Sequence, residues 1–190
     1  MKQLHMTEKS YRLHGAEIEG ERVLLRPITP EDTPLIVKWR NTESVRRNFI
    51  FRGPFTAEVH TRWMETKVAS GEVLQYIIVD KETDESVGSV YFRDVNRENR
   101  SAEYGIFIGE EAARGKGLGS EVARIFTDFG FNELKLHRIS LRLLADNTQA
   151  EKSYANGGFR REGLFRDMVR LDGKYRDVLF MAKLNGEDEA

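Results

Sequence analysis

The 190-residue sequence contains no cysteine. This absence excludes a disulfide framework, a cysteine nucleophile and a thiolate metal site. The sequence also lacks an apolar run that approaches the roughly 20 residues of a membrane-spanning helix, so we expect no membrane partner. Its first residues are polar and have no apolar segment typical of a secretory signal. We therefore expect a cytoplasmic protein.

An excess of one charge is also lacking, because 30 Lys and Arg residues stand against 31 Asp and Glu residues. Binding to nucleic-acid phosphates depends on many unpaired Lys and Arg side chains, so we expect no nucleic-acid partner. The four histidines show neither i,i+4 spacing nor a nearby carboxylate pair. We therefore expect no metal site. These histidines are His5, His14, His60 and His137.

The length of the chain suits one domain, since a single hydrophobic core usually organises about 100–200 residues. No internal repeat or Pro/Ser-rich linker divides the middle of the sequence. We expect a single domain over residues 21–184. A flexible segment at residues 1–20 should precede it, and a flexible acidic tail at residues 185–190 should follow it.

Runs of β-branched and aromatic residues alternate with segments of helical periodicity, which predicts a mixed α and β protein. Thr29 followed by Pro30 and two acidic residues is a typical helix start. A second helix should run from about residue 56 to 71 with Val59, Trp63 and Val68 facing inward. Further helices are expected over residues 118–129 and 148–156. Strands are expected at residues 22–26, 75–80, 86–92, 102–108, 138–144, 163–171 and 174–184, with a hairpin turn at Asp172-Gly173.

A glycine-rich loop, Ala113–Ser120, connects the strand at residues 102–108 to a helix. Glycine tolerates positive φ, so the backbone N–H groups of such a loop can converge on an anion at the helix N-terminus, and pyrophosphate is the obvious candidate. A Walker loop is not present, and a dinucleotide fingerprint fails because Ser120 replaces its third glycine. The pattern that fits is Arg-x-x-Gly-x-Gly, formed by Arg114, Gly117 and Gly119.

Together with a second segment, Asn147-x-x-Ala-x-x-x-Tyr154-x-x-x-Gly-Phe159, this loop resembles the GCN5-related N-acetyltransferase (GNAT) superfamily. The resemblance extends over residues 22–184. It implies an α/β (α+β) fold in which a twisted mixed β-sheet with splayed central strands is flanked by helices. It also implies that acetyl-CoA enters the opening between the splayed strands. The activity implied is N-acetyltransfer from acetyl-CoA to a primary amine by direct attack in a ternary complex.

The same resemblance assigns roles to individual residues. Tyr154 should protonate the leaving CoA thiolate, and the alternative is a packed aromatic residue whose hydroxyl caps a backbone group. Asn147 should bind the pantetheine arm or cap the following helix. The remaining residues expected to bind the cofactor are Phe107 and Ile108, through backbone N–H groups, and Arg114, Gly115, Lys116, Gly117, Leu118, Gly119 and Ser120.

Glu103 is the candidate general base. Strand alternation places it on the same face as Gly105 and Phe107, and a buried carboxylate without a partner is costly. Relatives of this branch carry an acidic residue at the equivalent strand position. The alternative is a surface glutamate that is paired with Arg93 or Arg100.

The acceptor is the least defined part of the reaction. Residues 24–41 resemble the openings of ribosomal-protein N-terminal, spermidine and amino-sugar nucleotide acetyltransferases, so the acceptor is a protein N-terminus or a small amine. Arg46, Arg47 and Arg52 favour an acceptor with a phosphate or carboxylate, and the alternative is a solvated loop. A non-catalytic acyl-CoA-binding regulatory module is a second function, which Tyr154 and Glu103 disfavour. Dimers are common among relatives, so a homodimer is considered.

Overall fold

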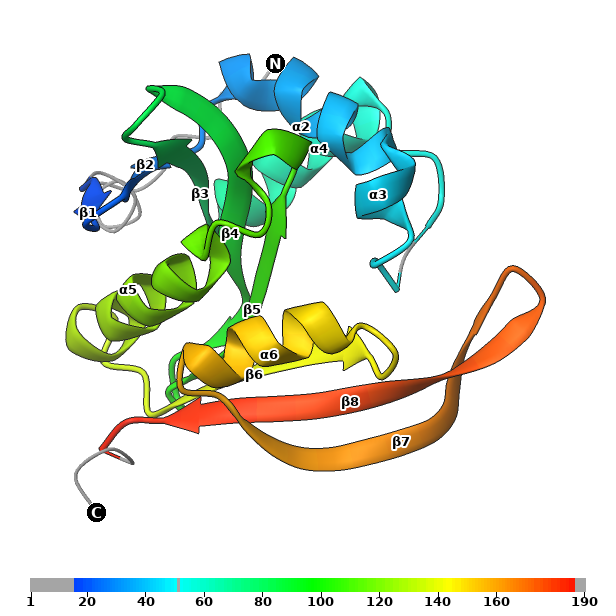
Figure 1. Ribbon diagram of the computed structural model, residues 1–190. Coiled ribbons are helices and arrows are strands. Elements are labelled where there is room, and N and C mark those ends of the chain that lie inside the picture. Colours follow the sequence, from blue (N-terminus) through cyan, green and yellow to red (C-terminus); the bar gives the residue numbers. More distant parts are fainter. Residues whose placement is uncertain (1–15, 51, 187–190) are drawn as a thin grey trace.

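The computed structural model describes residues 16–50 and 52–186. These residues form one eight-stranded sheet with the order β1-β2-β3-β4-β5-β6-β8-β7, flanked by helices (Figure 1). All neighbouring strands are antiparallel except β5 and β6, which are parallel. The strands are β1 (Ile18–Glu19), β2 (Val23–Pro27), β3 (Leu74–Asp80), β4 (Glu85–Asn96), β5 (Ser101–Ile108), β6 (Arg138–Leu144), β7 (Arg160–Leu171) and β8 (Lys174–Leu184).

The predicted strands are confirmed, and β6 and β8 have the expected bounds. Asp172 and Gly173 have φ values of 49° and 81°, as the two-residue hairpin turn between β7 and β8 requires. Within the segment at residues 1–20 that was expected to be flexible, Ile18 and Glu19 form β1 and pair with Leu25 and Leu24 of β2. Backbone pairing at this edge of the sheet orders a segment with little apolar content. Residues 1–15 of the predicted N-terminal segment and 187–190 of the predicted tail lie outside the described residues.

The first helix starts where Thr29 and Pro30 predict it. The backbone N–H of Thr29 donates to Asp32 Oδ2 at 2.8 Å, and Arg26 holds both carboxylate oxygens of Asp32. The helical elements are the 3₁₀ turn η1 (Pro30–Asp32), α2 (Thr33–Asn41), α3 (Glu43–Arg46), α4 (Ala57–Trp63), its π-helical continuation η2 (Met64–Val68), the 3₁₀ turn η3 (Glu111–Ala113), α5 (Leu118–Asn132) and α6 (Thr148–Asn156).

The predicted inward face of the helix at residues 56–71 is wrong at Val59 of α4, which is 44% exposed, and right at Val68 of η2, which is buried. The side chain that α4 buries instead is His60, whose Nδ1 lies 2.9 Å from Thr33 Oγ1. This hydrogen bond and the ring of Phe55 fix the rotation of α4 against α2, and Val59 is then directed away from the core.

The sheet separates two apolar layers. On one side, which we call the α2 face, Ile77 and Phe107 pack against Ile36 and Trp39. On the other side, the α5 face, the alternate strand residues pack against α5 in a cluster that includes Tyr76, Ile78, Tyr104, Val122 and Phe126. Strand alternation explains why neighbours in sequence serve different layers. Figure 1 shows α2, α3 and α4 on the opposite side of the sheet from α5.

Strands β5 and β6 splay apart in the centre of this sheet. They pair only from Ser101–Arg138 to Glu103–Ser140. Beyond Glu103, the edge of β5 that faces β6 has no strand partner, which confirms the opening expected from the resemblance. Backbone polar groups on such an edge need other partners. Among the described residues, no helix is long and apolar enough to cross a membrane. The cytoplasmic location and the homodimer stay predictions.

Candidate functional site

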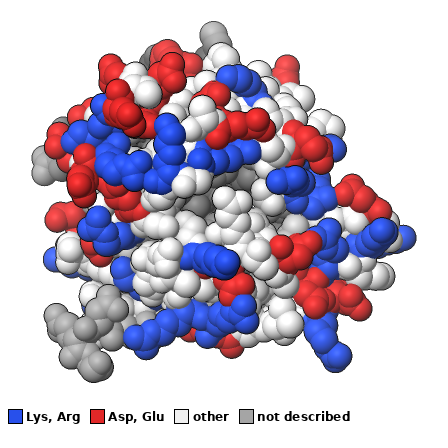
Figure 2. All heavy atoms as spheres, viewed as in Figure 1, with Lys and Arg blue, Asp and Glu red and all other residues white. Residues whose placement is uncertain are grey.

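The opening between β5 and β6 belongs to a cleft of about 750 Å³. Residues from both faces of the sheet line it, including Arg40 of α2 and Phe49 on one side and Gly119 of α5 and Tyr154 of α6 on the other. Figure 2 shows the hollow in the middle of one face of the molecule, with basic side chains around its rim. The volume lies within the range of small-molecule sites. The cleft therefore connects the α5 face with the α2 face.

The glycine loop is open and its N–H groups are available. Gly115 and Gly117 have φ values of 74° and 83°, and a Cβ on Gly115 would meet no atom within 4 Å. Within the described residues, no backbone carbonyl accepts from the N–H groups of Gly115, Lys116 or Gly117. The first turn of α5 adds further N–H groups that have no acceptor within the helix. This set of donors fits a diphosphate.

Four loop residues differ in what they offer. Arg114 does not extend outward, because its Nε and Nη2 donate to the carbonyls of Ile108 and Gly109 at 3.0 and 3.2 Å. Lys116 is not among the residues that line the cleft. Its carbonyl accepts a hydrogen bond from Arg22 Nη1 at 2.7 Å. Leu118 is 1% exposed and packs in the core, so only its backbone is left for a ligand. The N–H of Ser120 donates to Gly117 O at 3.1 Å.

Beside the start of α5, where Ser120 Oγ lies 3.2 Å from Ser153 Oγ, α6 presents Tyr154 to the cleft. Asn147 caps this helix, since its Oδ1 accepts from the N–H of Ala150 at 3.2 Å, and it also lines the cleft. The Tyr154 ring packs edge-on against Tyr104 and Phe159, with both centroid distances at 6.0 Å. Burial, assisted by Tyr91, raises the pKa of the Tyr154 hydroxyl well above its usual range. The hydroxyl therefore stays protonated at neutral pH.

Phe107 and Ile108 belong to the part of β5 that lies beyond its pairing with β6. The Phe107 ring is buried on the α2 face against Trp39 and Phe49, at centroid distances of 6.1 and 5.7 Å. Its side chain is thus occupied by packing. What β5 offers at this point of the cleft is its backbone.

Glu103 lies on the α2 face of the cleft and carries two ion pairs. Its carboxylate accepts from Arg142 Nη2 at 2.8 Å and from Arg93 Nη2, and its side chain is only 17% exposed. The alternative was a surface glutamate paired with Arg93 or Arg100. Arg93 is a partner, but the carboxylate is largely buried and its second partner is Arg142. Arg142 comes from β6, across the splay. No local sequence signal connects it to Glu103.

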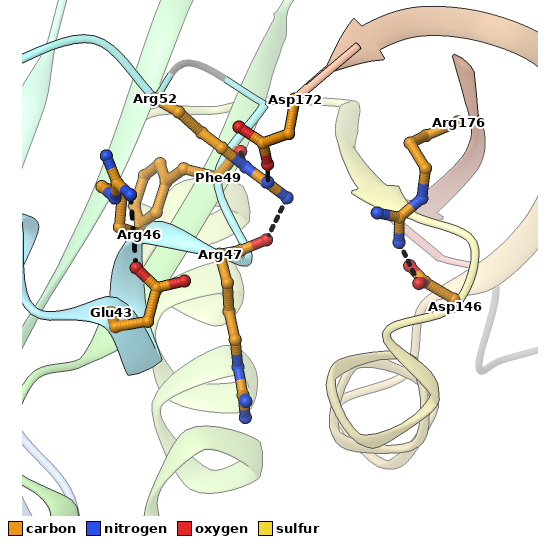
Figure 3. Close-up of polar contacts among 8 residues, drawn as sticks. All are labelled: Glu43, Arg46, Arg47, Phe49, Arg52, Asp146, Asp172 and Arg176. Atoms are coloured by element: carbon orange, nitrogen blue, oxygen red, sulfur yellow. Dashed lines mark hydrogen bonds and ion pairs between the residues drawn. The ribbon is translucent and has the colours of Figure 1, made fainter. Parts of the chain in front are cut away.

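The predicted cluster of Arg46, Arg47 and Arg52 is divided (Figure 3). Arg46 pairs with Glu43 at 3.3 Å. Arg52 donates to Asp172 in the β7–β8 turn at 2.5 Å and to the carbonyl of Arg47 at 2.5 Å. Of the three, only Arg47 lines the cleft. Arg52 therefore fastens this segment to the β7–β8 hairpin, and the charges of Arg46 and Arg52 are neutralised by Glu43 and Asp172.

Sequence reasoning missed the polar atoms that the cleft leaves without partners. In the described part of the chain, four buried side-chain polar atoms lack a hydrogen-bond partner, and all four belong to residues that line the cleft. Buried polar groups are almost always hydrogen-bonded, so such a concentration marks a ligand site. The atoms are Arg40 Nη1, His60 Nε2, Arg93 Nε and Tyr104 Oη. No group of three or more His, Asp or Glu residues suited to a metal ion occurs in the described ranges.

Comparisons with known proteins agree with this geometry. A family model described as an acetyltransferase (GNAT) domain matches residues 22–160. A Bacillus licheniformis protein named uncharacterized N-acetyltransferase p20 is 31% identical over 171 residues, which cover 88% of this chain and 95% of that protein. Spermidine N(1)-acetyltransferase of Escherichia coli K12 is 30% identical over 159 residues, 84% of each chain.

Among solved structures, spermidine N-acetyltransferase from Vibrio cholerae in complex with CoA and spermine superimposes with a TM-score of 0.82. The match covers 90% of this chain and all of that chain at 22% identity, which shows a shared fold. The family match and the relatives extend this likeness to activity. The chain therefore belongs to the GNAT acetyltransferase family, whose members use acetyl-CoA as co-substrate for the N-acetylation of an amine.

Proposed function

We propose that this protein transfers the acetyl group of acetyl-CoA to a primary amine by direct attack within a ternary complex. The observation that carries the proposal is the continuity of the cleft, which joins the glycine loop before α5 to Glu103 and Arg40 on the α2 face. Tyr154 lines the same cleft. A site of this form lets a thioester and an amine enter from different faces and meet between β5 and β6, so no acyl-enzyme is needed.

The chain's own groups would hold the cofactor and stabilise charge. The free N–H groups around Gly115, Gly117 and Gly119 bind the diphosphate, and Asn147 contacts the pantetheine arm. When bound, acetyl-CoA supplies the acetyl group as an activated thioester. Backbone N–H groups of Phe107 or Ile108 donate to the acetyl oxygen, where negative charge develops as the amine attacks.

Tyr154 and Glu103 would manage the protons. The amine nitrogen bonds to the acetyl carbon as the carbon–sulfur bond breaks, and Tyr154 gives its proton to the departing sulfur. The proton lost by the amine leaves through water to Glu103, and solvent restores the Tyr154 hydroxyl. Water is the first acceptor in this scheme because Arg93 and Arg142 already donate hydrogen bonds to the Glu103 carboxylate.

The candidate acceptors are a protein N-terminus, an amino-sugar nucleotide and a polyamine. A polyamine requires carboxylates, yet the only acidic side chain that lines the cleft in the described residues is Glu103, which two arginines already hold. The basic lining side chains are Arg40, Arg47, Arg93, Arg114, Arg142 and Lys152. This balance of charge supports the first two acceptor types.

Acceptor-dependent release of the CoA thiol tests the proposal. The purified protein is supplied with acetyl-CoA and a panel of amines, and mass spectrometry identifies the acetylated product. We expect thiol release that rises with the concentration of at least one amine. If calorimetry detects acetyl-CoA binding while no amine accelerates thiol release, the transferase proposal is wrong and the regulatory module is favoured.

A further inference from the structure

Arg40 is a partly buried cation without a counter-charge. Its guanidinium carbon lies 3.3 Å from the centroid of the Phe49 ring and 4.9 Å from that of Phe55. Its Nη1 is buried and has no hydrogen-bond partner. Burial lowers the pKa of Arg40 to about 10, and the Tyr91 hydroxyl, which burial keeps protonated at neutral pH, opposes this shift only in part. Among the described residues, no Asp or Glu pairs with it.

An arrangement of this kind is costly for the free protein. An unpaired guanidinium that has lost water loses solvation free energy, and the stacked rings recover only part of it. A structural arginine in such a position normally has a carboxylate beside it. The missing partner is therefore expected to come with a ligand.

Arg40 lies on the acceptor side of the cleft. It belongs to α2, whereas the glycine loop leads into α5 on the opposite face of the sheet. Beside it, Tyr91 of β4 covers Gly105 of β5, where a Cβ would lie 2.5 Å from the Tyr91 hydroxyl. Gly105 shares its face with Glu103, so the group that meets Arg40 enters beside the proposed base and apart from the diphosphate of CoA.

A second polar atom on the α2 face indicates the same ligand chemistry. Arg93 Nε can only donate a hydrogen bond and has no acceptor at hydrogen-bond distance, although the Asp94 carboxylate lies 3.8 Å from it. Arg47, from the loop that Arg52 fastens to the hairpin, adds a second guanidinium to the lining. The site therefore offers donors and positive charge, which an anionic oxygen group satisfies and an ammonium group does not.

We infer that Arg40 binds a carboxylate or phosphate of the acceptor and so makes the enzyme select anionic amines over polyamines. This inference rests on the proposed transferase function and adds the substrate class. Arg40 is a specificity residue, since the reacting atoms meet at Glu103 and Tyr154.

Matched acceptor pairs test it. The first pair is glucosamine 6-phosphate and glucosamine. The second pair is a short peptide with an N-terminal serine followed by aspartates and the same peptide with asparagines in place of the aspartates. Spermidine is the cationic probe. The first pair reports on phosphate and the second on carboxylate. The variants are Arg40→Met, which keeps length without charge, and Arg40→Lys, which keeps charge without the planar donors. Arg46→Met is the matched control, because Arg46 is exposed, pairs with Glu43 and does not line the cleft.

In the wild type we expect kcat/KM for the anionic member of at least one pair to exceed that of its neutral twin by about 10-fold or more, as befits a charged hydrogen bond. Arg40→Met should remove this advantage through a higher KM, and Arg40→Lys should keep part of it. Arg46→Met should behave as the wild type. The affinity of every variant for acetyl-CoA should be unchanged.

Three results overturn the inference: no preference for either anionic member, a preference that survives Arg40→Met, or spermidine as the best acceptor. Calorimetric titration of the same acceptors into the protein–CoA complex separates this inference from the proposed function. If calorimetry shows tighter binding of the anionic acceptors that depends on Arg40, but no amine causes thiol release, the inference stands and the transferase proposal is wrong. If amines cause thiol release but neither binding nor turnover depends on Arg40, the transferase proposal stands and the inference about Arg40 is wrong. If Arg40→Met does not fold, the test rests on Arg40→Lys, and a preference that Arg40→Lys keeps in full overturns the inference.

Discussion

Gly117→Ala isolates the contribution of the glycine loop to acetyl-CoA binding. Gly117 is the N-cap of α5 and has φ 83° and ψ 0°, a left-handed conformation. The nearest atom to an added Cβ is Arg22 Nη1 at 3.8 Å, so alanine meets no steric clash. The cost of the substitution is therefore conformational and amounts to about 1–2 kcal/mol.

The exposed loop can release this strain by changing its backbone angles, since within the described residues the N–H groups of residues 115–117 donate to no backbone carbonyl. The N–H groups then have to return to their converging arrangement when the diphosphate binds. A cost of about 1–2 kcal/mol on binding corresponds to a roughly 5- to 30-fold higher Kd for acetyl-CoA. Isothermal titration calorimetry on the two proteins measures this ratio.

Gly173→Ala is the matched control. Gly173 has φ 81°, close to the 83° of Gly117, and no atom lies within 4 Å of an added Cβ. Its turn lies directly between the Leu171–Lys174 pair of the β7–β8 ladder, so the strain cannot be released locally. We expect a Tm lower by about 2–8 °C for Gly173→Ala, with an unchanged Kd for acetyl-CoA. Wild-type acetyl-CoA affinity in Gly117→Ala, or an equal loss in both variants, would refute the role of the loop.

Further substitutions test the proton-transfer roles of Tyr154 and Glu103 and the Arg26–Asp32 ion pair at the start of α2. Tyr154→Phe should lower kcat by roughly 10²- to 10⁴-fold without changing acetyl-CoA affinity, and the raised pKa of Tyr154 predicts no fall in wild-type kcat from this group below about pH 10; a variant as fast as the wild type contradicts the acid role. Glu103→Gln should reduce turnover most at lower pH, and an unchanged pH–rate profile would show that Glu103 only orders Arg93 and Arg142. Asp32→Asn should lower the free energy of unfolding by about 2 kcal/mol, less than for a fully buried pair because the Arg26 side chain is 30% exposed. Desolvation alone would raise the pKa of Asp32, but hydrogen bonds from Arg26 and Thr29 lower it. This stability is therefore present above the unfolded pKa of about 3.9 and is lost as the pH falls through the folded value. Denaturant titrations at pH 7 and pH 3 should accordingly show a smaller difference between wild type and Asp32→Asn in acid, and a pH-independent difference would contradict the assignment.

Much of the fold follows from local signals. The cap at Thr29, the turn at Asp172-Gly173 and the helix from Thr148 to Asn156 are all found where residue type and spacing predict them. Such features depend on neighbours within a few residues, which a sequence displays directly. The inward face of α4 was different. Its rotation depends on His60 meeting Thr33, which lies 27 residues earlier in the chain.

For the site, the sequence by itself determined the family resemblance, the glycine loop and the order of the elements that surround the cleft. Those properties depend on glycine conformations and on apolar periods along the chain. Only the tertiary structure decided which charges are neutralised. Arg52 reaches Asp172 across 120 residues, Arg142 reaches Glu103 across 39 residues, and Arg40 is left without a partner. The energy of an ion pair decreases with the distance between its charges, so it depends on which side chains come within a few ångströms of each other. Sequence periodicity does not report that proximity for residues far apart in the chain.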